Sequence, residues 1–123
     1  MTSFDTSFSK IIHHSNLYIE MIVDEGINIE ERHANELNAI FDENFSNPFG
    51  LLINFENPYS FSFRGGANLG RTELLKKIAL LAERDMTAIT LQTFILFQRE
   101  KHPERDIMLF NSREHAIAWL ENL

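Results

Sequence analysis

The residues best suited to chemistry lie between two arginines, in the run Arg64-Gly-Gly-Ala-Asn-Leu-Gly-Arg71. Gly65 and Gly66 permit close approach of a ligand to the backbone, and Arg64 and Arg71 add positive charge on either side. The run could therefore bind an anion through backbone amides and guanidinium groups. It is not a phosphate-binding P-loop, because the Gly-Lys-Ser/Thr ending is missing. A structural turn with two solvated arginines is the alternative interpretation.

Other residue types that support catalysis or metal binding are absent or badly spaced. His13 and His14 are adjacent on an expected strand, so their side chains point to opposite faces and cannot share a metal ion. His33 stands on an expected helix without the His-Glu-x-x-His spacing of zinc proteases. The chain has no cysteine and no Gly-x-Ser-x-Gly nucleophile motif. We expect no catalytic residue, no metal site and no cofactor.

Composition limits the classes of partner. The 123 residues are 44% hydrophobic, which suits one domain with its own core, and the net charge is −7. Nucleic acids and anionic membranes require a concentrated positive surface, so neither is an expected partner. No apolar run reaches the length of a membrane span, and the N-terminal residues lack an apolar signal core. We expect a soluble domain, and the lack of cysteine favours the cytoplasm.

The glycine-containing run follows the segment around which the fold should be built. Phe49 to Asn57 is a short apolar run bounded by Asn-Pro pairs, which predicts a central strand covered on both faces. Ligands and partners of open α/β sheets bind beyond the ends of such strands, so we look for function first between Pro58 and Arg71. Phe8 to Ile12 and Leu17 to Val23 are expected to form a hairpin. The wetter face of the second arm would comprise Tyr18, Glu20, Ile22 and Asp24.

Helix signals follow at three places. Asn28 can cap a helix with Glu31 three residues later, and its apolar stripe comprises Ile29, His33, Leu37, Ile40, Phe41 and Phe45. Thr72 can cap a short helix through Lys77. Asp106 to Phe110 is predicted as a strand, followed by a helix capped by Ser112 whose buried stripe comprises Ala116, Trp119, Leu120 and Leu123.

Two segments are ambiguous. Thr72 to Arg84 reads as one continuous helix on propensity, whereas Ile78 to Ala82 alone reads as a buried strand. Residues Ala88 to Phe97 are rich in β-branched side chains, yet Asp85 or Thr87 could cap a helix there and Lys101-His102-Pro103 could end it. The residues themselves leave both alternatives open.

The order of these elements resembles a known family. The pattern Lys77-Ile-Ala-Leu-Leu-Ala-Glu83, then Ile107-Met-Leu-Phe110, then Ser112-Arg-Glu-His-Ala-Ile-Ala-Trp-Leu120 is similar to the SpoIIAA-like branch of the STAS fold. The resemblance implies a single α/β domain with an initial hairpin, a mixed sheet of about five strands, and helices mainly on one face. It also implies a strand at Ile78 to Ala82 and a helix at Met86 to Gln98.

That helix would have more apolar positions than one core-facing stripe needs. Met86, Ile89, Phe94 and Phe97 are the residues that could form either a partner interface, including one between two copies, or a pocket for a small apolar or lipid-like molecule. A helix buried on two sides is the alternative interpretation.

Sigma-factor antagonists of the STAS fold carry a phosphorylated Asp-Ser pair after the central strand. Here that region offers Ser60 and Ser62, flanked by phenylalanines, and no Asp-Ser pair. The sequence thus suggests a non-catalytic binding or regulatory module that contacts another protein or itself through Ser60, Ser62, Arg64, Gly65, Gly66 and Arg71. A carrier of an apolar ligand beneath the helix near residues 86 to 98 is the alternative.

Overall fold

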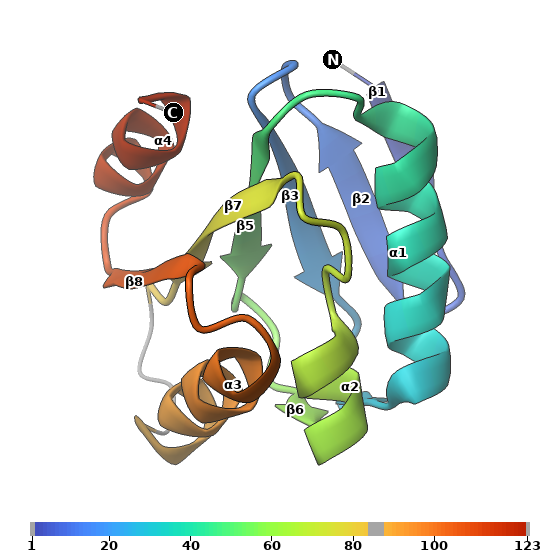
Figure 1. Ribbon diagram of the computed structural model, residues 1–123. Coiled ribbons are helices and arrows are strands. Elements are labelled where there is room, and N and C mark those ends of the chain that lie inside the picture. Colours follow the sequence, from blue (N-terminus) through green and yellow to red (C-terminus); the bar gives the residue numbers. More distant parts are fainter. Residues whose placement is uncertain (1, 84–87, 123) are drawn as a thin grey trace.

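The computed structural model describes residues 2–83 and 88–122, and its centre is a six-stranded mixed sheet (Figure 1). The strand order is β1-β2-β3-β5-β7-β8. The pairs β1–β2 and β2–β3 are antiparallel, whereas β3, β5, β7 and β8 run parallel to one another. The strands are β1 (Thr2–Asp5), β2 (Ser9–His13), β3 (Tyr18–Val23), β5 (Phe49–Asn54), β7 (Leu75–Leu81) and β8 (Asp106–Phe110). A second, parallel pair consists of β4 (Asn28–Ile29) and β6 (Ser60–Phe61).

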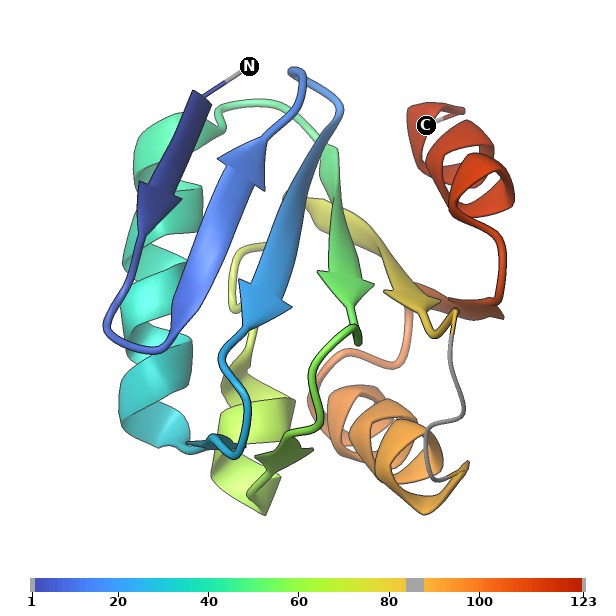
Figure 2. The ribbon, with the colours of Figure 1, turned by 180° about the vertical axis from the view of Figure 1, so that it is seen from behind.

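Three helices pack on one face of this sheet and one on the other (Figures 1 and 2). They are α1 (Glu31–Asn44), α2 (Phe63–Asn68), α3 (Ala88–Lys101) and α4 (Arg113–Glu121). The main core lies beneath α1 and α3, and a smaller core lies between α4 and strands β5 and β7. Figure 2 shows that α4 lies over the part of its face near β5, β7 and β8, away from β1 and β2. The predicted mixed α/β class, with helices mainly on one face, is confirmed.

The central strand is where the sequence predicts it. All six residues of β5 are buried, and parallel neighbours flank it on both sides. Alternate side chains supply the two cores: Leu51 and Ile53 face the main core, and Leu52 faces α4. A helix on each face explains why the sequence shows a continuous apolar run there rather than an alternation.

The two ambiguous segments are resolved. β7 covers Leu75–Leu81, so the strand alternative is correct and the continuous helix from Thr72 to Arg84 is wrong. Ala82, expected as the last strand residue, lies just beyond it. The later segment is the helix α3, which continues to Lys101, before Pro103. Met86 lies outside the described residues.

Several local predictions need correction. The first helix begins at Glu31 rather than after Asn28, because Asn28 and Ile29 pair with β6; Glu30 precedes the helix, and its N–H donates to His33 Nδ1 at 2.9 Å. The expected helix from Thr72 to Lys77 is wrong, because Leu75 already belongs to β7.

The strand count and one strand face also differ from expectation. The main sheet has six strands rather than about five, since the short polar segment Thr2–Asp5 adds an edge strand. The second hairpin arm has no wet face at Tyr18 and Glu20, because both are buried beside α4.

The C-terminal elements follow the prediction closely. β8 has the expected bounds, and Ser112 Oγ caps α4 by accepting a hydrogen bond from the His115 N–H at 3.4 Å. Ala116 and Leu120 are buried, whereas Trp119 is half-buried against Phe110. Leu123 lies outside the described residues. No helix within residues 2–83 and 88–122 combines the length and the apolar character that crossing a membrane requires.

Candidate binding surface on α2 and α3

The segment from Pro58 to Arg71, which the sequence marks as the first place to look for function, contains the short helix α2. Ser62 is its N-cap: Ser62 Oγ accepts a hydrogen bond from the Gly65 N–H at 3.0 Å and donates one to the Ile29 carbonyl at 3.1 Å. Ser60 is exposed in β6, and its hydroxyl donates to Asn28 Oδ1 at 3.0 Å. Both serines therefore attach α2 and β6 to β4.

Gly65 and Gly66 are buried inside α2, where their lack of a side chain permits close packing. A Cβ atom on Gly65 would lie 1.9 Å from the Ile29 carbonyl oxygen, and one on Gly66 would lie 2.8 Å from Phe97 Cδ2. Their N–H groups donate to Ser62 Oγ and to the Ser62 carbonyl. The amides expected to face an anion thus hold the helix together.

Arg64 and Arg71, the flanking arginines, are exposed and point to different acidic side chains of α1. Arg64 Nη1 lies 3.8 Å from Glu31 Oε2, and Arg71 Nη2 lies 3.9 Å from Asp42 Oδ2. Exposed pairs of this kind contribute little to stability. The two arginines therefore fit the alternative interpretation, a structural turn with solvated arginines, better than a site where both bind one anion.

A buried polar network, which no sequence pattern predicts, fixes the connection from α2 to β7. Asn38 on α1 donates to the Asn68 carbonyl at 2.9 Å and accepts from the N–H groups of Gly70 and Arg71 at 2.8 and 3.0 Å. From the other side, the Gln98 side chain on α3 donates to the carbonyls of Gly66 and Leu69 at 2.7 and 2.8 Å. Side chains from α1 and α3 thus hold the C-terminal end of α2 in place through hydrogen bonds.

Arg105, which follows α3, completes this network. Its guanidinium donates to the carbonyls of Leu75, Gly70 and Thr72 and to Gln98 Oε1, at distances from 2.6 to 3.1 Å. Within the described residues no carboxylate pairs with it, and burial lowers the pKa of Arg105 to about 10. Four carbonyl oxygens accept hydrogen bonds from this buried charge and the Glu104 carboxylate adds a favourable charge interaction, so the network depends on its complete set of hydrogen bonds.

The outer sides of α2 and α3 carry exposed apolar residues. Phe63 is 47% exposed, and Ile89 and Leu96 are 76% and 66% exposed. Ile89 and Leu96 are two turns apart and share one helix face. Phe97 is half-buried and packs edge-on against Phe63 with ring centroids 5.2 Å apart, which joins the two helices into one apolar area.

Charged residues of both signs surround these apolar residues. Arg64 lies beside Phe63 on α2, and Arg99, Glu100 and Lys101 end α3. A hollow of about 400 Å³ is lined by Glu31, Phe63, Arg64, Ala67, Asn68 and Lys101. In residues 2–83 and 88–122 no ion pair involves Arg99 or Lys101. We call Phe63, Ile89, Leu96 and Phe97, with Arg64, Arg99 and Lys101, the α2–α3 surface.

The structure divides the apolar residues predicted from sequence. Ile89 and Phe97 belong to the α2–α3 surface, whereas Phe94 is fully buried and contacts Phe61 with ring centroids 4.6 Å apart. Leu91 is buried on the same side of α3. Packed side chains therefore fill the space beneath this helix. Sequence analysis missed Phe63 and Leu96, although the spacing of Leu96 from Ile89 was a usable signal.

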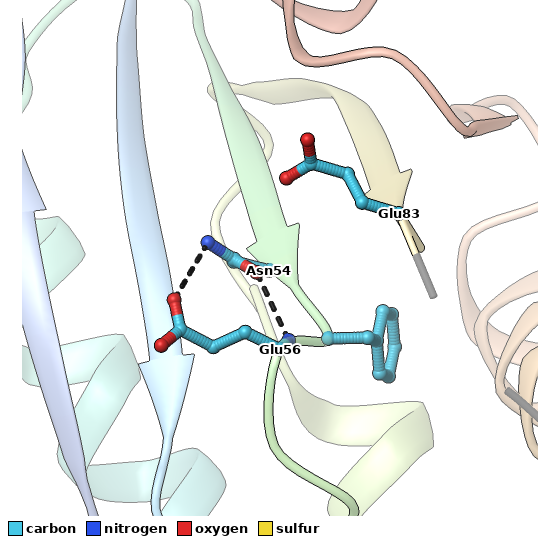
Figure 3. Close-up of a pocket in the computed structure, with 4 residues that line it drawn as sticks. Asn54, Glu56 and Glu83 are labelled. Carbon is cyan, nitrogen blue, oxygen red and sulfur yellow. Dashed lines mark hydrogen bonds between the residues drawn. The ribbon is translucent and has the colours of Figure 1, made fainter. Parts of the chain in front are cut away.

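A second polar site lies at the carboxyl ends of β5 and β7. A hollow of about 370 Å³ is lined by Asn54, Phe55, Glu56 and Glu83. Figure 3 shows Asn54 hydrogen-bonded to Glu56, with the Glu83 carboxylate beyond them. Asn54 Nδ2 also donates to Glu20 Oε2 at 2.8 Å, which connects the hollow to a buried carboxylate.

Glu20 is only 1% exposed and has three polar neighbours. Arg113, at the start of α4, donates to both carboxylate oxygens, and His14 Nε2 lies 2.6 Å from Glu20 Oε1. Burial alone would raise the pKa of Glu20, but the hydrogen bonds from Arg113, Asn54 and His14 outweigh it, and the pKa is lowered. The carboxylate thus stays charged and anchors α4 to the sheet.

Metal coordination finds no support in the described segments, since no three histidine or acidic side chains there converge on one point. The chain matches no protein-family model, no curated protein and no solved structure. The resemblance to the SpoIIAA-like branch therefore remains a prediction from the sequence.

Proposed function

We propose that this chain is a non-catalytic binding module of STAS type, related to the SpoIIAA-like branch, that holds a protein partner on its α2–α3 surface. The observation that supports this most directly is the exposure of Phe63, Ile89 and Leu96 on the outer sides of the neighbouring helices α2 and α3. Contiguous apolar area rimmed by polar residues is typical of protein interaction sites.

The apolar residues are exposed although the fold does not need them. Leu91, Phe94 and Gln98 already supply the side of α3 that faces the sheet. Fully burying a leucine or isoleucine side chain contributes about 1.5–3 kcal/mol, so covering Ile89 and Leu96 by a partner would favour binding by several kcal/mol before association costs.

Charge indicates the chemistry of the partner. The chain as a whole has a net charge of −7, yet around the α2–α3 surface three cations, Arg64, Arg99 and Lys101, outnumber the two acidic residues Glu31 and Glu100. A partner segment with apolar anchors and flanking acidic residues would complement this border. Such a segment would be repelled by most of the remaining surface, which favours this one site.

The carrier alternative has weaker support. A ligand pocket for a drug-sized molecule holds about 300–1,000 Å³. The hollow between β6 and α3, lined by Ser60, Phe61, Ile89, Thr90 and Thr93, holds about 200 Å³, and Leu91 and Phe94 occupy the space beneath the helix. We therefore favour a protein partner.

A quantitative capture experiment tests the proposal. Immobilised wild-type chain and the variants Leu96→Asp and Arg99→Glu would be compared by mass spectrometry of bound proteins, followed by a Kd with the purified partner. The matched control is Leu17→Asp, because Leu17 is also exposed but lies before β3, at the other end of the sheet.

We expect both variants of the α2–α3 surface to raise the Kd for the same partner at least about tenfold, equivalent to ~1.4 kcal/mol, while the control leaves this Kd unchanged. The Arg99→Glu effect should shrink in high salt. Equal Kd values for all four proteins would refute the proposal. Native mass spectrometry of the purified chain tests the carrier alternative, which predicts a bound apolar molecule.

A further inference from the structure

The strand β8 forms an open edge of the main sheet and is unusually apolar on its surface. In the sheet as described for residues 2–83 and 88–122, its one neighbour is β7. Met108 and Leu109 are 50% and 53% exposed, and they point to opposite faces of the sheet. Natural edge strands are usually protected by lysine, proline or inward charge, and the run Asp106–Phe110 has only Asp106 at its start.

The opposite edge of the sheet is different. β1 has the sequence Thr-Ser-Phe-Asp, and its outer positions are polar except for Phe4, which packs on the main core. A polar edge strand of this kind does not attract a further strand. Of the two edges of the main sheet, as far as residues 2–83 and 88–122 show, only the β8 edge combines unpaired backbone with exposed apolar side chains on both faces.

The backbone of β8 presents its free groups at two residues. The Phe110 carbonyl accepts a hydrogen bond from the Ala82 N–H at 2.9 Å, so the backbone N–H and C=O groups of Phe110 point toward β7. The backbone groups of successive strand residues point alternately to the two neighbouring strands, so those of Met108 also point toward β7. The N–H and C=O groups of Ile107 and Leu109 therefore point away from the sheet, available to another strand.

We propose that β8 pairs antiparallel with β8 of a second copy of this chain, about a two-fold axis at Met108. In that register Ile107 lies opposite Leu109 of the partner subunit, and the outward N–H and C=O groups of both residues form hydrogen bonds. The symmetry repeats this pair, which gives four backbone hydrogen bonds. The side chains of Ile107 and Leu109 lie on the same face of the sheet as those of their β7 partners Ile78 and Leu80. Across the two-fold axis, each therefore also contacts the side chain of its counterpart in the other subunit.

Charge favours the antiparallel direction for a second copy. Glu104 and Asp106 lie at the start of β8. Antiparallel pairing in this register places them opposite Ser112 and Phe110 of the partner subunit, whereas parallel pairing would place each acidic residue beside its own copy. The pairing uses none of the residues of the α2–α3 surface, so it can exist with or without the proposed protein partner.

The test combines mass with residue-resolved hydrogen exchange. Light scattering should give twice the chain mass of 14.3 kDa at high concentration, and the amides of Ile107 and Leu109 should become protected as the dimer forms. Leu109→Lys should raise the dimer Kd at least about tenfold. Leu109→Pro removes an N–H that points away from β7, so it should abolish the dimer and leave the fold intact.

Leu96→Lys is the matched control, since Leu96 is similarly exposed but lies on α3. It should leave the dimer Kd unchanged. A chain that is monomeric at about 1 mM overturns the proposal. So does a dimer that resists both Leu109 substitutions, that responds to Leu96→Lys instead, or in which the Ile107 and Leu109 amides exchange as fast as in the monomer.

Discussion

Replacing Gly65 by alanine should destabilise the fold, although the position is helical. In an ordinary helix interior, alanine is more favourable than glycine by up to about 1 kcal/mol. Here the added Cβ would lie 1.9 Å from the Ile29 carbonyl oxygen and 2.5 Å from its carbon. Both are backbone atoms of β4, so no side-chain rotation can relieve the contact.

The size of the effect follows from what must move. Ordinary contact distance requires α2 and β4 to separate by roughly 1.5 Å. The Ile29 carbonyl accepts hydrogen bonds from the Ser62 N–H at 2.9 Å and from Ser62 Oγ at 3.1 Å, and both would be weakened. Two hydrogen bonds at about 1 kcal/mol each, plus packing strain of about 1–3 kcal/mol, exceed the helix gain and give a net loss of roughly 3 kcal/mol.

Urea unfolding followed by circular dichroism measures this loss. With a slope typical of small domains, a change of roughly 3 kcal/mol lowers the midpoint by about 2 M. Gly66→Ala is the matched control, because its closest neighbour is Cδ2 of the Phe97 ring, a side-chain atom that can move. We expect the control to cost less than about 1 kcal/mol. If Gly65→Ala is as stable as the wild type, the packing of α2 against β4 described above is incorrect.

Two further predictions concern the buried charges. Arg105→Lys should lower the free energy of unfolding by roughly 3 kcal/mol, because one ammonium cannot replace a guanidinium that donates to four acceptors. The control Arg99→Lys, at an exposed position, should change it by less than about 0.5 kcal/mol. Equal thermal midpoints for the two variants would contradict this prediction. Acidification should destabilise the fold in two stages. Burial lowers the pKa of His33 below 6.5 and hydrogen bonds lower that of Glu20 below 4.5, so the unfolded state binds protons first in each case and stability falls as pH drops below these values. Urea midpoints between pH 7 and 3 measure both stages, and Glu20→Gln should remove the second; an unchanged acid profile in that variant would contradict the assignment.

The sequence predicts best those elements whose pattern is local. β5 and β8 read correctly because apolar runs of strand length stand between turn residues, and α1 reads correctly because its stripe has helical spacing. The secondary structure of β7 could not be predicted from its own residues, since its Leu, Ala and Lys residues favour a helix. In the fold, β7 lies between two parallel strands, which favours β structure. Tertiary context therefore selects the strand.

The candidate site was predictable in position but not in construction. The segment after β5 does carry exposed residues that could bind a partner. Helix α2 was not predicted there, because Gly65 and Gly66 disfavour a helix and the close packing that requires them cannot be known from the sequence. Asn38, Gln98 and Arg105 could not be identified in advance. They lie far apart in the sequence, and as single polar residues they look the same as exposed ones until the fold brings them to one connection.

The way α2 is held has a consequence for binding at the α2–α3 surface. Ser62 and the tight contact at Gly65 fix the N-terminal end of the helix, and Asn38, Gln98 and Arg105 fix its C-terminal end. Six residues of helix would not be stable alone, since isolated helices of this length do not form in water. Held at both ends, α2 presents Phe63 in a fixed position, so a partner need not order it. Because ordering interface side chains and loops costs about 0.5–1.5 kcal/mol for each immobilised group, loosening either end should weaken partner binding even where no contact residue is changed.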